Sequence, residues 1–159
     1  MKSTESRDKS SRGNASQFFI AGELCRRGYS AVITLGNTPN VDILCSNQQG
    51  TRFAHIQVKT FVPGNRTCSV GIKAMKNVGT TFFWVLGGIP PPGSNRPFEY
   101  YVIPSEVMAK NVSDAHQLWL STPGKRARRT RITRSEQFIF RLTSLLVVGI
   151  FRILATDGI

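Results

Sequence analysis

The strongest constraint on the fold is the segment 52–60, in which apolar and polar side chains alternate. Ala54, Ile56 and Val58 occupy every second position. Successive side chains of a β-strand point to opposite faces of a sheet, so a period of two predicts a strand. One face of this strand is expected to be apolar, and the other carries Phe53, His55, Gln57 and Lys59.

A second predicted strand, 41–45, precedes this segment, and the residues between them favour a turn. A two-residue or a four-residue turn within 47–52 gives the same hairpin register, with Asp42 opposite Gln57. Directly opposed side chains point to the same face, and Lys59 follows on that face. A slip of one residue would bury Asp42, which is costly. The apolar side chains are expected on the other face: Val41, Ile43, Ala54, Ile56 and Val58.

The rest of the chain predicts an α+β or α/β domain on one mixed sheet. A helix is expected from about residue 15 to Arg27, with Asn14 or Ser16 as N-cap and Gly28 as C-cap signal. Further strands are predicted at 30–35, 68–73, 81–88 and 98–104, a loop at 89–97, and short helices at 104–110 and 113–120. We expect three parts: a flexible arm (1–13), one domain (14–124), and a basic segment with an apolar tail (125–159).

Charge gives the first indication of a partner. The net charge is +12, and such a field attracts polyanions. Residues 125–134 hold six basic residues and no acidic one, which is half of the excess. This run is either a solvated segment or a contact for the DNA backbone, and membrane-surface attraction is a third alternative. The candidate nucleic-acid contacts are Arg66, Lys73, Lys76, Lys125, Arg126, Arg128, Arg129 and Arg131.

The polar face of the predicted hairpin carries groups suited to phosphodiester chemistry. Carboxylate and amide oxygens, here of Asp42 and Gln57, suit Mg²⁺, which keeps several of its waters. The ammonium of Lys59 can stabilise charge on a reacting phosphate. Glu23, on the preceding helix, is a further candidate ligand or base. The structural alternatives are a turn aspartate, the wet face of a strand, and a helix carboxylate paired with Arg27.

These residues resemble a known family. Glu23 on an N-terminal helix, the segment GNTPNVDIL with Asp42, and the segment HIQVKT with Gln57 and Lys59 are similar to the PD-(D/E)xK nuclease superfamily. That superfamily contains restriction endonucleases, Holliday-junction resolvases and some homing endonucleases. The resemblance covers about residues 14–104 and implies a restriction-endonuclease-like fold, a central mixed β-sheet flanked by α-helices.

By the same resemblance, Asp42, Gln57 and the Val58 carbonyl would bind Mg²⁺ or Mn²⁺. Lys59 would act on the nucleophile, and Glu23 would support the metal or the water. The sequence departs from the family pattern in two places. Gln57 replaces the usual acid, which lowers the expected metal affinity, and Pro39 lies three residues before Asp42 instead of beside it.

The resulting hypothesis is a metal-dependent DNA endonuclease, a homodimer if both strands are cut. The alternatives are a non-catalytic DNA-binding module and a peripheral membrane protein. The membrane alternative rests on the apolar tail, 136–154. This tail is expected to pack in the core or in a dimer, to lie as a helix at a membrane interface, or to form a short membrane span. The N-terminus has no secretory apolar segment, so a cytoplasmic protein is expected. The three scattered cysteines are expected as small core residues: Cys25, Cys45 and Cys68.

Overall fold

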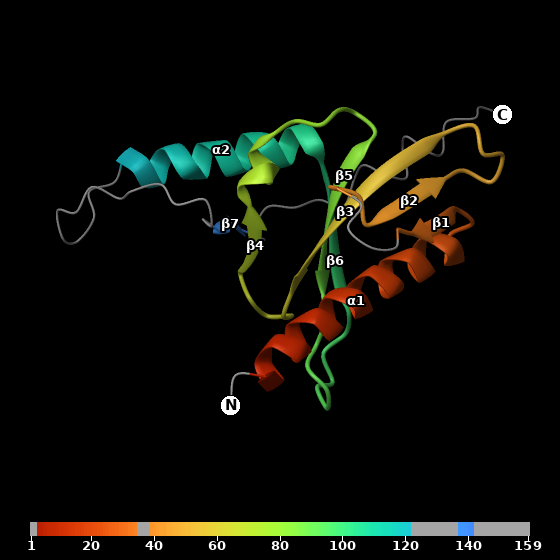
Figure 1. Cartoon of the computed structure of the whole chain (residues 1–159), viewed down its shortest axis with the longest axis horizontal. Coiled ribbons are helices and arrows are strands. Elements are labelled where there is room, and N and C mark those ends of the chain that lie inside the picture. Colours follow the sequence, from red (N-terminus) through yellow and green to blue (C-terminus); the bar gives the residue numbers. More distant parts are fainter. Residues whose placement is uncertain (1–2, 35–38, 122–136, 142–159) are drawn as a thin grey trace.

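The computed structural model describes residues 3–34, 39–121 and 137–141 (Figure 1). Its elements are α1 (Ser3–Arg26), β1 (Ser30–Ile33), β2 (Ile43–Ser46), β3 (Phe53–Phe61), β4 (Thr67–Gly71), the 3-10 helix η1 (Ile72–Met75), β5 (Phe82–Gly88), β6 (Glu99–Pro104), α2 (Ser105–Ser121) and β7 (Gln137–Arg141). Five strands form a sheet in the order β1-β2-β3-β5-β6, and β4 pairs with β7. Since β3 and β5 are parallel and the other neighbours antiparallel, the predicted central mixed sheet is confirmed.

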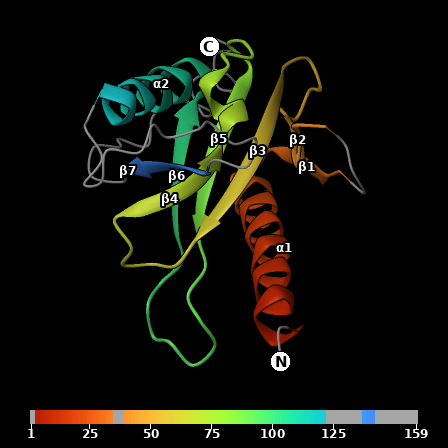
Figure 2. The same cartoon turned by 60° about the vertical axis from the view of Figure 1, so that its left-hand side comes forward.

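Two apolar cores lie on opposite faces of the five-stranded sheet. The α1-face core consists of Ile20, Ala21, Leu24, Ile43, Cys45, Ala54, Ile56, Val58, Phe83, Val85 and Val102. The α2-face core consists of Phe61, Cys68, Val70, Ala74, Phe82, Trp84, Leu86, Ile103, Met108 and Val112. Figure 2 shows α1 and α2 on the two sides of the sheet. All of β5 is buried because it contributes side chains to both cores in alternation.

The start of α1 differs from the prediction. The helix begins at Ser3, so residues 3–13, expected as a flexible arm, are helical, and neither Asn14 nor Ser16 is an N-cap. The first helical turns of α1, residues 3–13, contain no apolar residue, so a periodic apolar pattern could not predict them. The sequence does place Glu5 four residues before Lys9, a spacing of opposite charges that supports a helix.

The end of α1 confirms Gly28 as the stop signal. Gly28 has φ +87°, its N–H donates to the Cys25 carbonyl (2.9 Å), and the Tyr29 N–H donates to the Leu24 carbonyl (3.1 Å). This pair of bonds is a Schellman motif, which satisfies carbonyls left open at a helix end. Leu24 and Tyr29 both pack in the α1-face core, so the turn sends the chain directly into β1.

The helix α1 lies very close to the sheet at Gly87 of β5. A methyl group built there would lie 1.9 Å from Ser16 Oγ and 3.2 Å from Ile20 Cδ1. Glycine is therefore required for this helix-to-strand distance. The buried Ser16 hydroxyl has no hydrogen-bond partner among the described residues.

Three further expectations are corrected, two in the C-terminal elements and one at a cysteine of α1. A single helix, α2, replaces the two short helices predicted within 104–120. Residues 137–141 form β7 against β4, so this part of the tail is a strand and joins a second small sheet that was not predicted. Cys45 and Cys68 are buried as expected, but Cys25 is exposed on α1. None of the helices in the described ranges is long and apolar enough to cross a bilayer.

Candidate functional site

The β2–β3 hairpin has the predicted register. Ile43 lies opposite Ile56, and Asp42, the residue before β2, lies next to Gln57, with which it is hydrogen-bonded. The connection is the four-residue alternative, closed by an Asn47 N–H bond to the Arg52 carbonyl (3.2 Å). The buried side chain of Asn47 also accepts the N–H groups of Thr51 (2.9 Å) and Arg52 (3.0 Å). Asn47 was not singled out from the sequence, although asparagine is a frequent loop-closing residue.

Asp42 makes the central contacts of the site. Its Oδ2 accepts a hydrogen bond from Gln57 Nε2 and another from the backbone N–H of Val58 (2.6 Å). Its own N–H donates to the Ile56 carbonyl (2.8 Å). The N–H of Val58 is thus bound by a side chain at the point where the β2–β3 ladder ends. Asp42 and Gln57 are brought together as predicted, on a backbone that the strand pairing holds in place.

The end of this ladder also corrects the placement of Val41. Val41 was expected beside Ile43 on the apolar face of the hairpin. It packs instead against the α2-face core, whereas Ile43 is buried in the α1-face core. The regular alternation is broken because the Asp42 N–H bonds the carbonyl of Ile56, outside the register of β2.

Gln57 and Lys59 lie on the α2 side of the sheet. Their neighbours in β3, Ile56 and Val58, are buried in the α1-face core, so the alternating positions face the other way. Asp42, Gln57 and Lys59 are each half-buried and retain contact with solvent. The next residue of β2 on this face, Leu44, is 41% exposed, so the sheet is open beyond the site.

The electrostatics of the site reflect partial burial. Desolvation raises the pKa of Asp42 above its ordinary value. The hydrogen bond from the Val58 N–H and the charge of the Lys59 ammonium oppose this by lowering the same pKa. Burial likewise raises the pKa of Cys68 in β4 to about 11, again against the effect of Lys59. Lys59 therefore lies within electrostatic reach of both Asp42 and β4. A divalent cation would relieve the unfavourable burial of the Asp42 charge.

The donor set fits a hard cation. Oδ2 of Asp42 accepts the bonds from Gln57 and Val58, and among the described residues no hydrogen bond to its Oδ1 is found; Gln57 offers its amide oxygen. The C=O of a strand residue points to the same edge as its N–H, so the carbonyl of Val58 also faces Asp42. One carboxylate with neutral oxygens matches Mg²⁺, which binds few protein ligands. Across residues 3–34, 39–121 and 137–141, no three His, Cys, Asp or Glu residues cluster as metal ligands.

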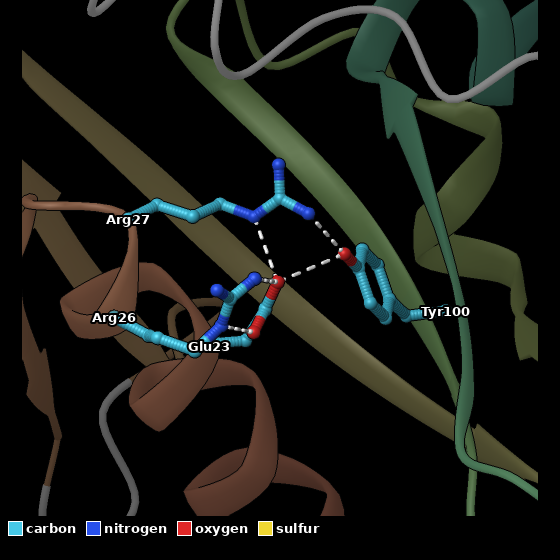
Figure 3. Close-up of polar contacts among 4 residues, drawn as sticks. All are labelled: Glu23, Arg26, Arg27 and Tyr100. Carbon is cyan, nitrogen blue, oxygen red and sulfur yellow. Dashed lines mark hydrogen bonds and ion pairs between the residues drawn. The ribbon is translucent and has the colours of Figure 1, made fainter.

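Glu23 is engaged elsewhere, as Figure 3 shows. Its carboxylate accepts bonds from Arg26 Nε (2.7 Å) and Nη2 (2.9 Å), from Arg27 Nε (2.8 Å), and from the Tyr100 hydroxyl (3.3 Å). Bonds from Arg26 and then Arg27 lower the pKa of Glu23 to about 2. The pairing with Arg27, which the spacing on the helix allowed, is confirmed. Glu23 and Tyr100 lie on the α1 side of the sheet, and the contacts that hold Glu23 join α1 to β6.

The other candidate contacts fall into two groups. Arg66, Lys73 and Lys76 are exposed, and Lys73 and Lys76 lie in or directly after η1, on the α2 side of the sheet. The basic run lies outside the described residues: Lys125, Arg126, Arg128, Arg129 and Arg131.

Comparison with known proteins gives one partial similarity of fold. No protein-family model matches this sequence, and no curated protein sequence matches it. A solved structure, that of the bacterial homing endonuclease I-Ssp6803I, is similar over 68% of this chain and 70% of its own chain. The two are 18% identical, with a TM-score of 0.42. The geometry of Asp42 and Gln57, and not this likeness, carries the proposal that follows.

Proposed function

We propose that this protein is a divalent-metal-dependent nuclease that hydrolyses DNA phosphodiester bonds, acting as an endonuclease. The observation that carries the proposal is the arrangement of Asp42. Its carboxylate is half-buried, bonded to Gln57 and to the backbone of Val58, and accompanied by Lys59 on the same open face. Burial makes a lone carboxylate unfavourable, and a cation at this position removes that penalty.

Each residue has a distinct role in the proposed site. Asp42, the Gln57 amide oxygen and the Val58 carbonyl would hold Mg²⁺ or Mn²⁺. A bound cation supplies a water of lowered pKa and positive charge beside the phosphate. Lys59 stabilises the negative charge that develops on the phosphate oxygens. The water loses a proton as its oxygen bonds to phosphorus, the bond from phosphorus to the leaving sugar oxygen breaks, and a proton from solvent passes to that oxygen.

The positive charge of the chain supports DNA as the substrate. The net charge of +12 favours a polyanion, and exposed Lys73 and Lys76 lie on the same side of the sheet as Lys59. Contacts of this kind bind phosphates without regard to base sequence and weaken as salt rises. We therefore propose that this side of the sheet faces the DNA backbone.

One experiment tests the reaction directly. Supercoiled, linear and branched DNA are incubated with the protein and Mg²⁺ or Mn²⁺, and cleavage is compared with that of Asp42→Asn and Lys59→Met. We expect both substitutions to abolish most cleavage. The matched controls are Asp114→Asn and Lys110→Met, because these two residues form an exposed ion pair on α2. Equal cleavage by wild type and Asp42→Asn would refute the assignment.

A second candidate function follows from Gln57. Its amide leaves a single carboxylate at the site, so a DNA-binding module without hydrolytic activity is the alternative. DNA binding that is insensitive to millimolar Mg²⁺, together with no cleavage, would favour this alternative. Cleavage that depends on Asp42 would exclude it.

A further inference from the structure

The segment that leads into Asp42 is held by contacts from several elements. The Thr34 hydroxyl donates to the Val41 carbonyl (2.6 Å), and the Thr34 N–H donates to the Asp42 carbonyl (3.0 Å). The side chain of Val41 packs against the α2-face core. The position of the Asp42 backbone is therefore fixed by Thr34, directly after β1, on one side and by the core on the other.

Asn40 begins this segment in an unusual backbone conformation. Its φ is +65°, and it is the one non-glycine residue in the described ranges with a positive φ. Asparagine tolerates this left-handed region better than most residues, but the conformation still costs free energy unless the surroundings hold it. Asn40 is exposed, so core packing does not supply that restraint.

The 3-10 helix η1 supplies a restraint from the other side of the site. Lys73 Nζ donates to Asn40 Oδ1 (3.0 Å). The next residue, Ala74, is fully buried in the α2-face core, against which Val41 also packs. Lys73 of η1 thus forms a hydrogen bond with the segment that leads into Asp42, and its neighbour Ala74 holds η1 in the core.

We propose that Lys73 and Asn40 are positioning residues of the cation site. Their hydrogen bond holds the left-handed residue two positions before Asp42, and so fixes the direction in which the carboxylate is presented. This inference rests on the proposed function, since it assumes that Asp42 binds the cation. It gives Lys73 a positioning task in addition to the contact with the DNA backbone proposed above.

The test measures Mg²⁺ dependence in two ways on the full chain. The first readout is the Mg²⁺ concentration that gives half-maximal cleavage, and the second is the rise in thermal midpoint on adding Mg²⁺ without DNA. Lys73→Met removes the bond and keeps the aliphatic stem, and Asn40→Gly removes the acceptor while allowing positive φ. Each is expected to raise the half-maximal Mg²⁺ concentration about twofold to tenfold, the range expected for one hydrogen bond.

Further variants separate positioning from other roles. Asn40→Asp keeps an acceptor and is expected to stay near the wild-type Mg²⁺ midpoint, as is the distant control Lys110→Met. The double variant of Lys73→Met and Asn40→Gly is expected to be no worse than either single variant, because both remove the same bond.

Two outcomes would overturn the inference. An unchanged Mg²⁺ midpoint in Lys73→Met, with weaker DNA binding and a smaller salt dependence, would make Lys73 a phosphate contact instead. Additive effects of the two substitutions would show that they do not act through one bond. Failure of the proposed function is a separate result, because Asp42→Asn would then leave the Mg²⁺ response unchanged.

Discussion

Replacing Gln57 by glutamate tests the cation site without relying on cleavage. In the structure, the amide of Gln57 donates a hydrogen bond to the carboxylate of Asp42. The Gln57→Glu substitution removes that donor and sets two carboxylates side by side in a half-buried position. The variant should therefore be less stable without a cation and respond more strongly to one.

The magnitude follows from the contact that is lost. A hydrogen bond to a charged group contributes about 1.5–3 kcal/mol, and two adjacent carboxylates repel each other. We expect the free energy of unfolding of Gln57→Glu to fall by about 2 kcal/mol in chelator, which lowers the thermal midpoint by about 4–8 °C for a chain of this size. A cation at a concentration of about 100 times its Kd returns about 2.7 kcal/mol.

Thermal unfolding followed by circular dichroism, with chelator and with Mg²⁺, measures both effects. The matched control is Gln49→Glu, which makes the same charge change at an exposed position of the hairpin loop. The control should unfold like wild type in both conditions. The reasoning is refuted if Gln57→Glu is as stable as wild type in chelator, or if Mg²⁺ stabilises both proteins equally.

Three more predictions follow from the site and the core. The pKa of Asp42 is raised above 3.8, and only its ionised carboxylate binds a cation. The rise in thermal midpoint on adding Mg²⁺ should therefore become larger as the pH increases through the titration of Asp42. A rise that does not depend on pH would contradict this. The pKa of Glu23 falls from 4.5 to about 2 on folding, so its contribution to stability is present above pH 4.5 and is lost as the pH falls toward 2. Glu23→Gln should therefore lose less stability than wild type over this pH range. The Mg²⁺ dependence of its cleavage at neutral pH should be unchanged. Gly87→Ala should lower the free energy of unfolding by about 1–3 kcal/mol, measured by chemical denaturation, because its methyl group meets Ser16 Oγ. Adding Ser16→Ala removes a buried hydroxyl without a partner among the described residues, so it should recover part of that loss. Equal stability of Gly87→Ala and wild type would argue against the close approach.

Local sequence patterns were sufficient for the hairpin that carries the candidate site. The period of two in 52–60 defined β3 and its faces, and the costly burial of Asp42 left one acceptable register. Gly28 likewise marked the end of α1, because a left-handed residue there costs glycine little. These features depend on neighbouring residues and on backbone geometry, both of which can be read along the chain.

Other features of the site depend on residues distant in sequence. The spacing of Glu23 and Arg27 allowed an ion pair, but Tyr100 of β6 joins that pair only because α1 packs across the sheet. The same holds for Lys73, which reaches Asn40 because β4 and η1 fold over the α2 face. The residues that flank Lys73 and those that flank Asn40 do not predict that hydrogen bond.

The sequence alone therefore determined that Gln57 and Lys59 lie on one strand, that Asp42 precedes its neighbour in the hairpin, and that Asp42 lies beside Gln57, since strand geometry fixes the side of each residue. Only the tertiary structure decided that Val41 turns to the opposite core, that β7 pairs with β4, and that Tyr100 of β6 joins Glu23 and its arginines on the α1 side. Those outcomes follow from the packing of whole elements against the two faces of one sheet, where the free energy depends on contacts between residues far apart in the chain.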